Sequence, residues 1–113
     1  MQLQFIYVPT QDLAGALALY RDRLGFDELW REGEQTVGLG IPDNEAAVMI
    51  DAAALPGSGP GPVFSVEGVD AWLAGMDGAL DVVVEPFDIP GGRMMALRDG
   101  DGNWTYVMDQ STA

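Results

Sequence analysis

The chain has 113 residues, 48% of them hydrophobic, which suffices to build the core of one domain. Eighteen Asp and Glu residues against five Arg give a net charge of −13, and a surface this acidic repels phosphate backbones, so we expect no nucleic-acid partner. The absence of cysteine and histidine excludes disulfides, thiolate metal sites, and catalysis by a cysteine nucleophile or a histidine base.

The first half of the chain predicts a strand, a helix and three further strands. Pro9 ends the first strand, and either Thr10 or Asp12 can cap the helix. The helix has apolar residues at the spacing of one face, and Gly25 is placed to end it. Those apolar residues are Leu13, Leu17, Tyr20 and Leu24, and the predicted strands are 2–8, 26–31, 36–41 and 46–50. A Gly- and Pro-rich segment at 52–61 then predicts a linker.

The same order of elements returns after the linker. We expect a strand at 62–66, a helix at 69–76 and strands near 81–85, 93–98 and 104–108. Trp72 has helical spacing with Val69, Leu73 and Met76, which favours packing between the helix and the outer face of the sheet. The fold class is therefore α+β: two βαβββ modules, 1–51 and 62–110, forming a curved, mostly antiparallel mixed sheet with one helix outside each half.

Short motifs along nearly the whole chain resemble those of one superfamily. In the first module these are Val-Pro-Thr-Gln-Asp-Leu at 8–13, Leu-Tyr-Arg-Asp at 19–22 and Leu-Gly-Phe at 24–26. The second module has Val-Phe-Ser-Val at 63–66, Glu-Pro at 85–86, Gly-Arg at 92–93 and Asp-Gly-Asp-Gly-Asn at 99–103. Each motif is weak alone, but the ordered set is similar to the glyoxalase / bleomycin-resistance / dioxygenase superfamily, which has the vicinal oxygen chelate fold.

The resemblance also indicates which metal ligands this chain lacks. The superfamily's first histidine position falls on Phe5, its second-module counterpart falls near Gly61, and the glutamate of the last strand falls on Tyr106. The remaining position falls on Met49 or Asp51, and the sequence does not decide between them. Divalent metals in such sites need three or four N or O ligands from the protein. We therefore expect no metal and no cofactor.

Other readings of the polar residues stay open at this stage. Asp51 and Glu85 are candidates for acid–base work only because both lie near strand ends that face the expected cup. Arg93 is either a group at the mouth of a pocket or a solvated charge at a strand edge. The 99–103 segment lacks the glycine and glutamate that a calcium loop needs, and its Asp-Gly steps predict a tight hairpin instead.

Aromatic and thioether side chains take the place of metal ligands in the expected cup. Strand alternation puts Phe5 and Tyr7 on one face of the first strand, and Trp104 and Tyr106 on one face of the last. Such side chains suit flat organic ligands, although each is also an ordinary core residue of a small β-rich domain. The predicted ligand-binding residues are Phe5, Tyr7, Trp30, Met49, Asp51, Met95, Trp104 and Tyr106.

The resemblance implies a metal-free protein that sequesters a small organic molecule at the interface of a homodimer. A cationic aromatic antibiotic or related metabolite is the expected ligand, and the charge of −13 would attract it, although this charge also serves solubility alone. An enzyme of the lyase, isomerase or oxygenase kind and a module that binds a peptide or protein are the alternatives. With no apolar run of ~20 residues and no basic leader, we expect a cytoplasmic protein without a membrane partner.

Overall fold

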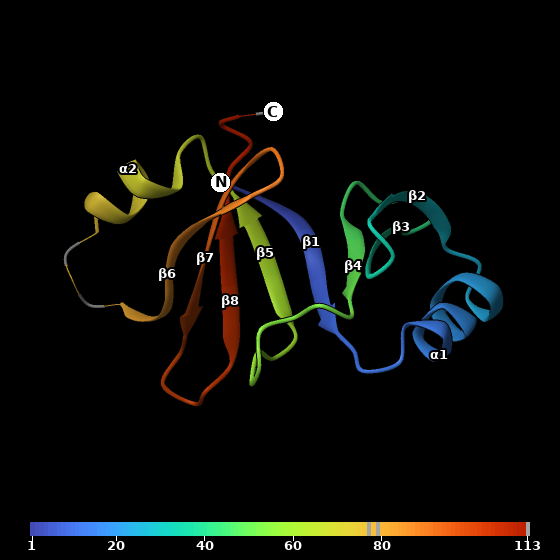
Figure 1. Cartoon of the computed structure of the whole chain (residues 1–113). Coiled ribbons are helices and arrows are strands. Elements are labelled where there is room, and N and C mark those ends of the chain that lie inside the picture. The colour runs from blue at the N-terminus through green and yellow to red at the C-terminus, as the bar shows by residue number, and fades with distance from the viewer. Residues whose placement is uncertain (77, 79, 113) are drawn as a thin grey trace. The chain divides into compact units, whose positions relative to one another are not determined.

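The computed structural model describes residues 1–76, 78 and 80–112, and it divides into two compact units (Figure 1). The N-terminal module is Gln4–Pro60, and the C-terminal module is Gly61–Ala113 together with Met1–Leu3. Each module has the element order of a βαβββ unit, so the predicted fold class is confirmed. Within the described residues, no helix is long and apolar enough to cross a membrane.

The N-terminal module is a four-stranded sheet with one helical segment. Its elements are β1 (Gln2–Pro9), α1 (Leu13–Leu17), η1 (Ala18–Arg23), β2 (Asp27–Glu32), β3 (Thr36–Gly40) and β4 (Ala47–Asp51). The strands lie in the order β2-β3-β4-β1, with β1 parallel to β4 and the other neighbours antiparallel. The strand predictions are correct to within one residue at each end.

The helical segment begins as predicted but changes its pitch halfway. Asp12, not Thr10, is the cap, because its carboxylate accepts a hydrogen bond from the Gly15 N–H at 3.0 Å. From Ala18 the chain forms a π-helix, η1, whose wider turns rotate Leu24 away from the sheet, so that Leu24 is exposed. Gly25 then ends the helix at φ +82°, a conformation that favours glycine.

Apolar residues on one face of this sheet form the core under α1. Leu17 packs with four fully or almost fully buried strand residues, which are Val37, Leu39, Val48 and Ile50. These residues alternate with Thr36, Gly38, Met49 and Asp51 along β3 and β4. The helix therefore covers one face, here called the outer face, and leaves the opposite inner face of the module to the alternating set.

The C-terminal module repeats this arrangement with longer strands. Its elements are β5 (Gly61–Ser65), α2 (Val69–Ala74), β6 (Asp81–Ile89), β7 (Gly92–Arg98) and β8 (Trp104–Met108). The strands lie in the order β5-β8-β7-β6, with β5 parallel to β8. The predicted strand near 81–85 is four residues longer in the structure, because two register shifts let edge strand β6 continue past Pro86.

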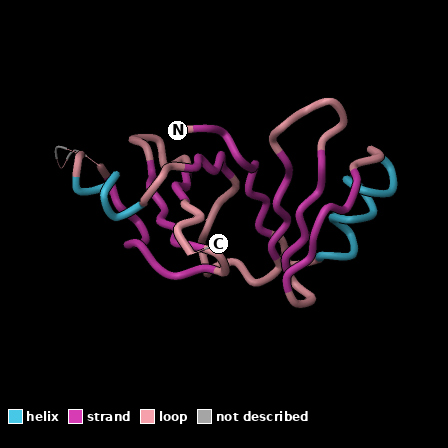
Figure 2. The backbone as a smooth tube through the Cα atoms, turned by 90° about the horizontal axis from the view of Figure 1, so that it is seen from above, coloured by secondary structure: helices cyan, strands magenta, loops and turns pink. Residues whose placement is uncertain are grey.

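The core of the C-terminal module lies between its sheet and α2. Val69, Met95, Leu97 and Val107 form this core, and Trp72 packs against it. The predicted outer-face position of Trp72 is therefore confirmed. In Figure 2 the helix of each module lies to one side of that module's own strands. The inner face of the C-terminal module is therefore the face of its sheet opposite α2.

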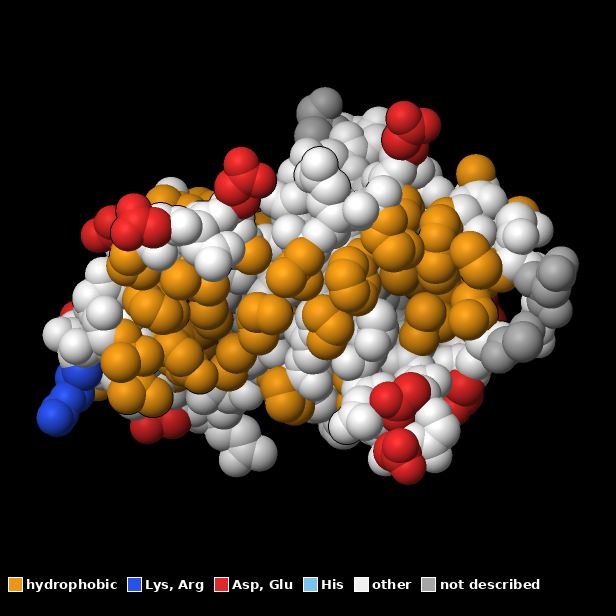
Figure 3. All heavy atoms as spheres, turned by 180° about the vertical axis from the view of Figure 1, so that it is seen from behind, with side chains coloured by type: hydrophobic (Ala, Val, Ile, Leu, Met, Phe, Trp, Pro, Cys, Tyr) orange, Lys and Arg blue, Asp and Glu red, His pale blue; other side chains and the backbone are white. Residues whose placement is uncertain are grey.

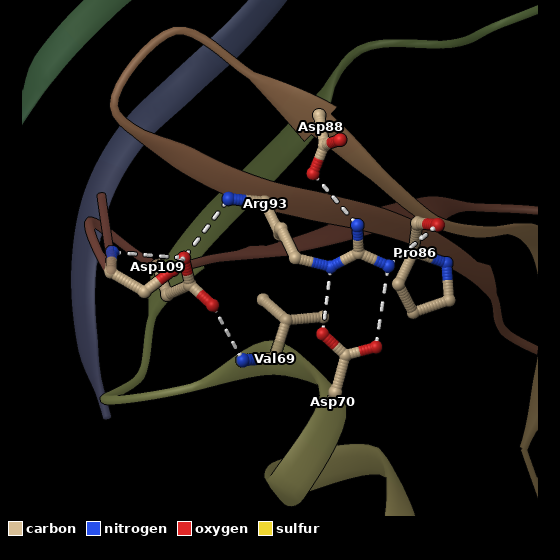
Figure 4. Close-up of polar contacts among 7 residues, drawn as sticks. Val69, Asp70, Pro86, Asp88, Arg93 and Asp109 are labelled. Carbon is tan, nitrogen blue, oxygen red and sulfur yellow. Dashed lines mark hydrogen bonds and ion pairs between the residues drawn. The ribbon is translucent and has the colours of Figure 1, made fainter. Parts of the chain in front are cut away.

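A carboxylate distant in sequence caps α2. The cap residue Gly68 has no side chain to bond the first turn, and Asp109, just after β8, supplies the acceptor (Figure 4). Asp109 Oδ2 accepts from the Val69 N–H at 2.7 Å, while Oδ1 accepts from the Arg93 N–H at 2.9 Å and from the backbone and hydroxyl of Ser111. Burial raises the pKa of Asp109, but these hydrogen bonds outweigh it and lower that pKa to about 2.

The side chain of Arg93 links α2 to β6 within the C-terminal module. Its Nε contacts Asp70 Oδ2 at 2.7 Å, its Nη1 contacts Asp88 Oδ1 at 2.8 Å and its Nη2 donates to the Pro86 carbonyl at 3.1 Å (Figure 4). All of these partners belong to the C-terminal module. Of the two expectations for Arg93, the edge charge is the better description, although the charge is paired and not simply solvated.

The 99–103 segment is the tight β7–β8 turn that the sequence predicts. Asp99 accepts hydrogen bonds from the backbone N–H groups of Asp101 and Asn103 and from the Asn103 side chain. The Asn103 side chain, followed by these N–H groups, lowers the pKa of the Asp99 carboxyl. Gly102 adopts φ +85° where the turn closes.

Candidate ligand-binding faces

Five of the predicted ligand residues share the inner face of the N-terminal module. Trp30 pairs with Gly38 across β2 and β3, and Gly38 pairs with Met49. Met49 pairs in turn with Tyr7, so one row crosses all four strands. Phe5 and Asp51 lie two residues from this row on β1 and β4, and alternation keeps them on the same face. The structure thus places these five residues on one face, and their ligand role remains a prediction.

The aromatic side chains of this face pack against each other. The rings of Phe5 and Trp30 meet at 81° with their centroids 5.9 Å apart, which is the edge-to-face geometry that aromatic pairs favour. Phe5 is buried and Trp30 is half-buried. Phe5 therefore forms part of the floor of the face, and Trp30 keeps surface that a ligand can contact.

A hydrogen-bonded carboxylate lies beside the aromatic row. Asp51 accepts from the Tyr7 hydroxyl at 2.5 Å through Oδ2, and from the Thr36 hydroxyl at 3.0 Å through Oδ1. The backbone N–H of Ala53 donates to the same Oδ1 at 2.9 Å. Three donors thus fix the half-buried carboxylate, and the carboxylate in turn orients the ring of Tyr7.

The Tyr7→Phe variant tests this network. We expect the free energy of unfolding to fall by about 1–2 kcal/mol, because Asp51 Oδ2 loses a donor in a half-buried position. Urea unfolding measures the change. Tyr20→Phe is the matched control, since it removes the hydroxyl of a partly buried tyrosine on the opposite face, and we expect it to change stability by less than about 0.5 kcal/mol. Equal losses in the two variants would contradict the role given to Asp51.

The inner face of the C-terminal module carries the second aromatic pair. Trp104 stacks on Tyr106 at an interplanar angle of 23° with centroids 6.0 Å apart. Tyr106 is buried beside Ala96 in the register of β7 and β8, and Trp104 is half-buried. The alternation predicted for the last strand is confirmed, and Trp104 is the member of the pair that keeps accessible surface.

The predicted place of Met95 is wrong. Met95 is opposite Val107 in the β7–β8 register, and both belong to the core under α2. Its side chain is 0% exposed, so it faces the helix and cannot line the inner face. Met94, one residue earlier, pairs with Met108 on the inner side instead. Glu85, the second carboxylate proposed for acid–base work, is exposed on edge strand β6.

The residues at the superfamily's ligand positions do not fit a divalent metal. Phe5 has no donor atom, and a side chain at Gly61 would overlap the carbonyl oxygen of Trp104, with its Cβ 2.9 Å from the carbonyl carbon. No group of three or more His, Cys, Asp or Glu residues that could hold a metal occurs in the part of the chain that the structure describes. We therefore derive no chemistry through a metal.

A separate hollow of about 300 Å³ lies beside the end of β1. Its lining comes from Pro9, Thr10 and Gln11 and from the segment between Ala52 and Ser58. It contains none of the predicted ligand residues and no charged side chain.

Figure 3 shows that hydrophobic side chains cover much of the side of each module seen there, and that Asp and Glu side chains lie near the margins.

Residues 2–107 match the Glyoxalase/Bleomycin resistance protein/Dioxygenase superfamily. No curated protein matches the sequence. The chain thus belongs to this superfamily, as its motifs predicted.

Solved structures agree on the fold. Methylmalonyl-CoA epimerase from Streptomyces coelicolor, in complex with 2-nitronate-propionyl-CoA, has a TM-score of 0.75 at 22% identity, covering 98% of this chain and 98% of that chain. The epimerase from Mycobacterium tuberculosis has a TM-score of 0.68 at 19% identity, covering 96% and 87%. A Legionella pneumophila structure described as an NAD-dependent benzaldehyde dehydrogenase has a TM-score of 0.78 at 13% identity, covering 94% and 97%. At these identities the likeness shows the fold alone.

Proposed function

We propose that this protein binds and sequesters a small aromatic, cationic organic molecule, such as an antibiotic or a related metabolite, without a metal. The observation that carries this proposal is the inner face of the N-terminal module. There the accessible part of Trp30 lies in one row with Met49, and the carboxylate of Asp51 lies beside that row. The enzyme and protein-interaction alternatives have no comparable support from the polar residues of this face.

The spacing of two rows on this face suits a ligand with an aromatic ring and a separate positive charge. The first row runs from Trp30 through Gly38 to Met49. The second, two residues further along the strands, runs from Glu32 through Thr36 to Asp51. Two residues of a strand span about 7 Å. A ring over the first row therefore places a cationic group about 7 Å away beside the carboxylates of the second.

Physical chemistry assigns a separate role to each part of the face. Burial of the ring against indole and thioether surface supplies affinity, and each aromatic pair adds ~0.5–1.5 kcal/mol beyond burial. The net charge of −13 raises the local concentration of cations and disfavours polyphosphate ligands such as coenzyme A esters. The mechanism is stoichiometric capture, with no bond made or broken.

We further propose that the protein acts as a cytoplasmic homodimer. Large hydrophobic residues remain exposed in both modules, including Leu3, Ile6, Leu29 and Phe87. Exposed apolar surface of this kind favours association, since burying it removes it from water. Sedimentation at micromolar concentration measures the mass, and a monomer under these conditions would contradict this part of the proposal.

A thermal-shift experiment tests the proposed function. The probes are bleomycin and ethidium as aromatic cations, spermidine as an aliphatic cation, methylmalonyl-CoA, and Zn²⁺, Ni²⁺ or Mn²⁺ alone. An aromatic cation at ~100 times its Kd should add ~2.7 kcal/mol of stability and raise Tm by roughly 10 °C. Spermidine, the acyl-CoA and the metals should give less than about a quarter of that shift. A shift from methylmalonyl-CoA or a metal, with none from the aromatic cations, would instead favour the enzyme alternative.

A further inference from the structure

Trp30 lies on a part of β2 that departs from regular pairing. Glu28 pairs with Leu39, but the next pair is Trp30 with Gly38, so Leu29 is an extra residue in the strand. This is a β-bulge, which bends a strand and redirects the side chains next to it. Leu29 is 60% exposed and its side chain lies over Gly40, while the indole of Trp30 lies over Gly38.

Gly38 provides the space that the indole occupies. A Cβ added at Gly38 would overlap Cε2 and Nε1 of Trp30 and would lie 2.6 Å from Cζ2. These three adjacent atoms span both rings of the indole, so the ring system lies across the position that any other side chain would fill. Gly40 differs, because the atoms nearest to a Cβ there belong to the movable side chain of Leu29, and the first of them lies at 3.3 Å.

The bulge and the glycine together place a flat surface on the inner face. With no Cβ beneath it, the indole packs against the backbone of β3, and the edge-to-face contact with Phe5 holds it from the side. Because Trp30 is only half-buried, part of its ring system stays open to a ligand. A ligand ring can approach this surface closely only if it is itself flat.

We propose that Gly38 is a positioning residue that sets the pose of Trp30, and that the pair selects ligands with a planar aromatic ring over ligands with a saturated ring of equal size and charge. This inference rests on the proposed function and deepens it. The negative charge of the protein attracts both kinds of cation to the face. Contact with the indole of Trp30, held in place over Gly38, then favours the planar ring over the saturated one. Gly38 acts through Trp30 and does not itself touch the ligand.

The experiment compares Gly38→Ala with Gly40→Ala, a matched glycine on the same strand and the same face. Both variants and the wild type are labelled with 5-fluorotryptophan, and the three tryptophan ¹⁹F signals are assigned by Trp→Phe substitutions. Titrations use benzyltrimethylammonium and (cyclohexylmethyl)trimethylammonium, which differ in the planarity of the ring and not in charge. Bleomycin serves as a larger third probe.

We expect the wild type to prefer the benzyl over the cyclohexylmethyl cation by up to about tenfold, the value of one stacking interaction. Gly38→Ala should move the Trp30 ¹⁹F signal, abolish this preference and weaken bleomycin binding. Gly40→Ala should leave the Trp30 ¹⁹F signal at its wild-type position. It should also leave the ring preference and the bleomycin affinity within about twofold of wild type. A Gly38→Ala protein that keeps its Trp30 signal, or keeps the preference, overturns the proposal.

Two further outcomes distinguish a failure of this inference from a failure of the proposed function. If the wild type binds none of the three probes, the proposed function fails and the selectivity with it, while the ¹⁹F signal of Gly38→Ala alone decides whether Gly38 positions Trp30. If Gly38→Ala does not fold, the double variant Gly38→Ala/Trp30→Ala is compared with Trp30→Ala. Equal stability of these two variants supports the proposal, because an alanine Cβ at position 38 can collide with the indole only when Trp30 is present. A double variant that still does not fold overturns the proposal.

Discussion

The Asp109→Asn variant will lower the free energy of unfolding by about 2–4 kcal/mol. Asp109 is 2% exposed, and both of its oxygens accept hydrogen bonds. Among the contacts described above, the backbone N–H groups of Val69 and Arg93 have no acceptor other than this carboxylate. Asparagine keeps the shape but has one acceptor atom. Its amide NH₂ must then face either the Val69 N–H or the group of donors from Arg93 and Ser111. One end of α2 or one end of β7 loses its acceptor whichever way the amide turns.

The effect of Asp109→Asn depends on pH in a defined direction. The folded-state pKa of Asp109, about 2, lies below its ordinary value of 3.8. The stabilisation from its charge is therefore fully present above pH 3.8 and is lost as the pH falls toward 2. This difference corresponds to about 2 kcal/mol, so the two proteins should become more alike in stability at low pH.

Urea unfolding at pH 7 and at pH 2.5 measures both effects. Asp101→Asn makes the same chemical change at an exposed position of the β7–β8 turn, and we expect it to alter stability by less than about 0.5 kcal/mol. An Asp109→Asn protein as stable as Asp101→Asn at pH 7 would show that the cap contributes little. A stability gap that does not narrow on acidification would contradict the low pKa.

Gly61→Ala is the second substitution with a large expected effect, a loss of about 2–4 kcal/mol. Its Cβ would overlap the carbonyl oxygen of Trp104, and this obstacle is backbone of the neighbouring strand, not a movable side chain. Strands β5 and β8 must separate to admit it. Gly100→Ala is the control, because an added Cβ there meets no atom within 4 Å, and its stability should stay within about 0.5 kcal/mol of wild type.

The same obstacle bears on whether a histidine side chain could be accommodated at this position. Gly61→His restores the residue type that the superfamily places near this position, but its side chain would enter the space of the Trp104 carbonyl. We expect this variant to lose stability like Gly61→Ala and to gain none from Zn²⁺ in a thermal-shift experiment. Stabilisation by zinc would mean that the strands can separate and that a single substitution recovers a ligand.

The sequence predicted the elements of this chain from local patterns. Alternation and helical spacing placed β1, β8 and Trp72 correctly, and the paired motifs predicted the superfamily over almost the whole chain. The sequence did not predict the change from α1 to the π-helix η1, because the spacing of the apolar residues fits both an α-helix and a π-helix until Leu24. The residue types at the superfamily's expected ligand positions could also be read directly, since the lack of a donor atom is a property of the residue itself.

The tertiary structure decided which residues meet across strands. Met95 was assigned to the wrong face because a shift of one residue in strand register exchanges the two faces, and the register of β7 depends on its pairing with β8. Two glycines on β3 look alike in the sequence, yet only Gly38 lies under an indole, since a bulge in β2 brings Trp30 there. The Asp109 cap joins residues 40 positions apart. Local patterns fix the period of each element, whereas register, bulges and caps arise only when distant segments pack.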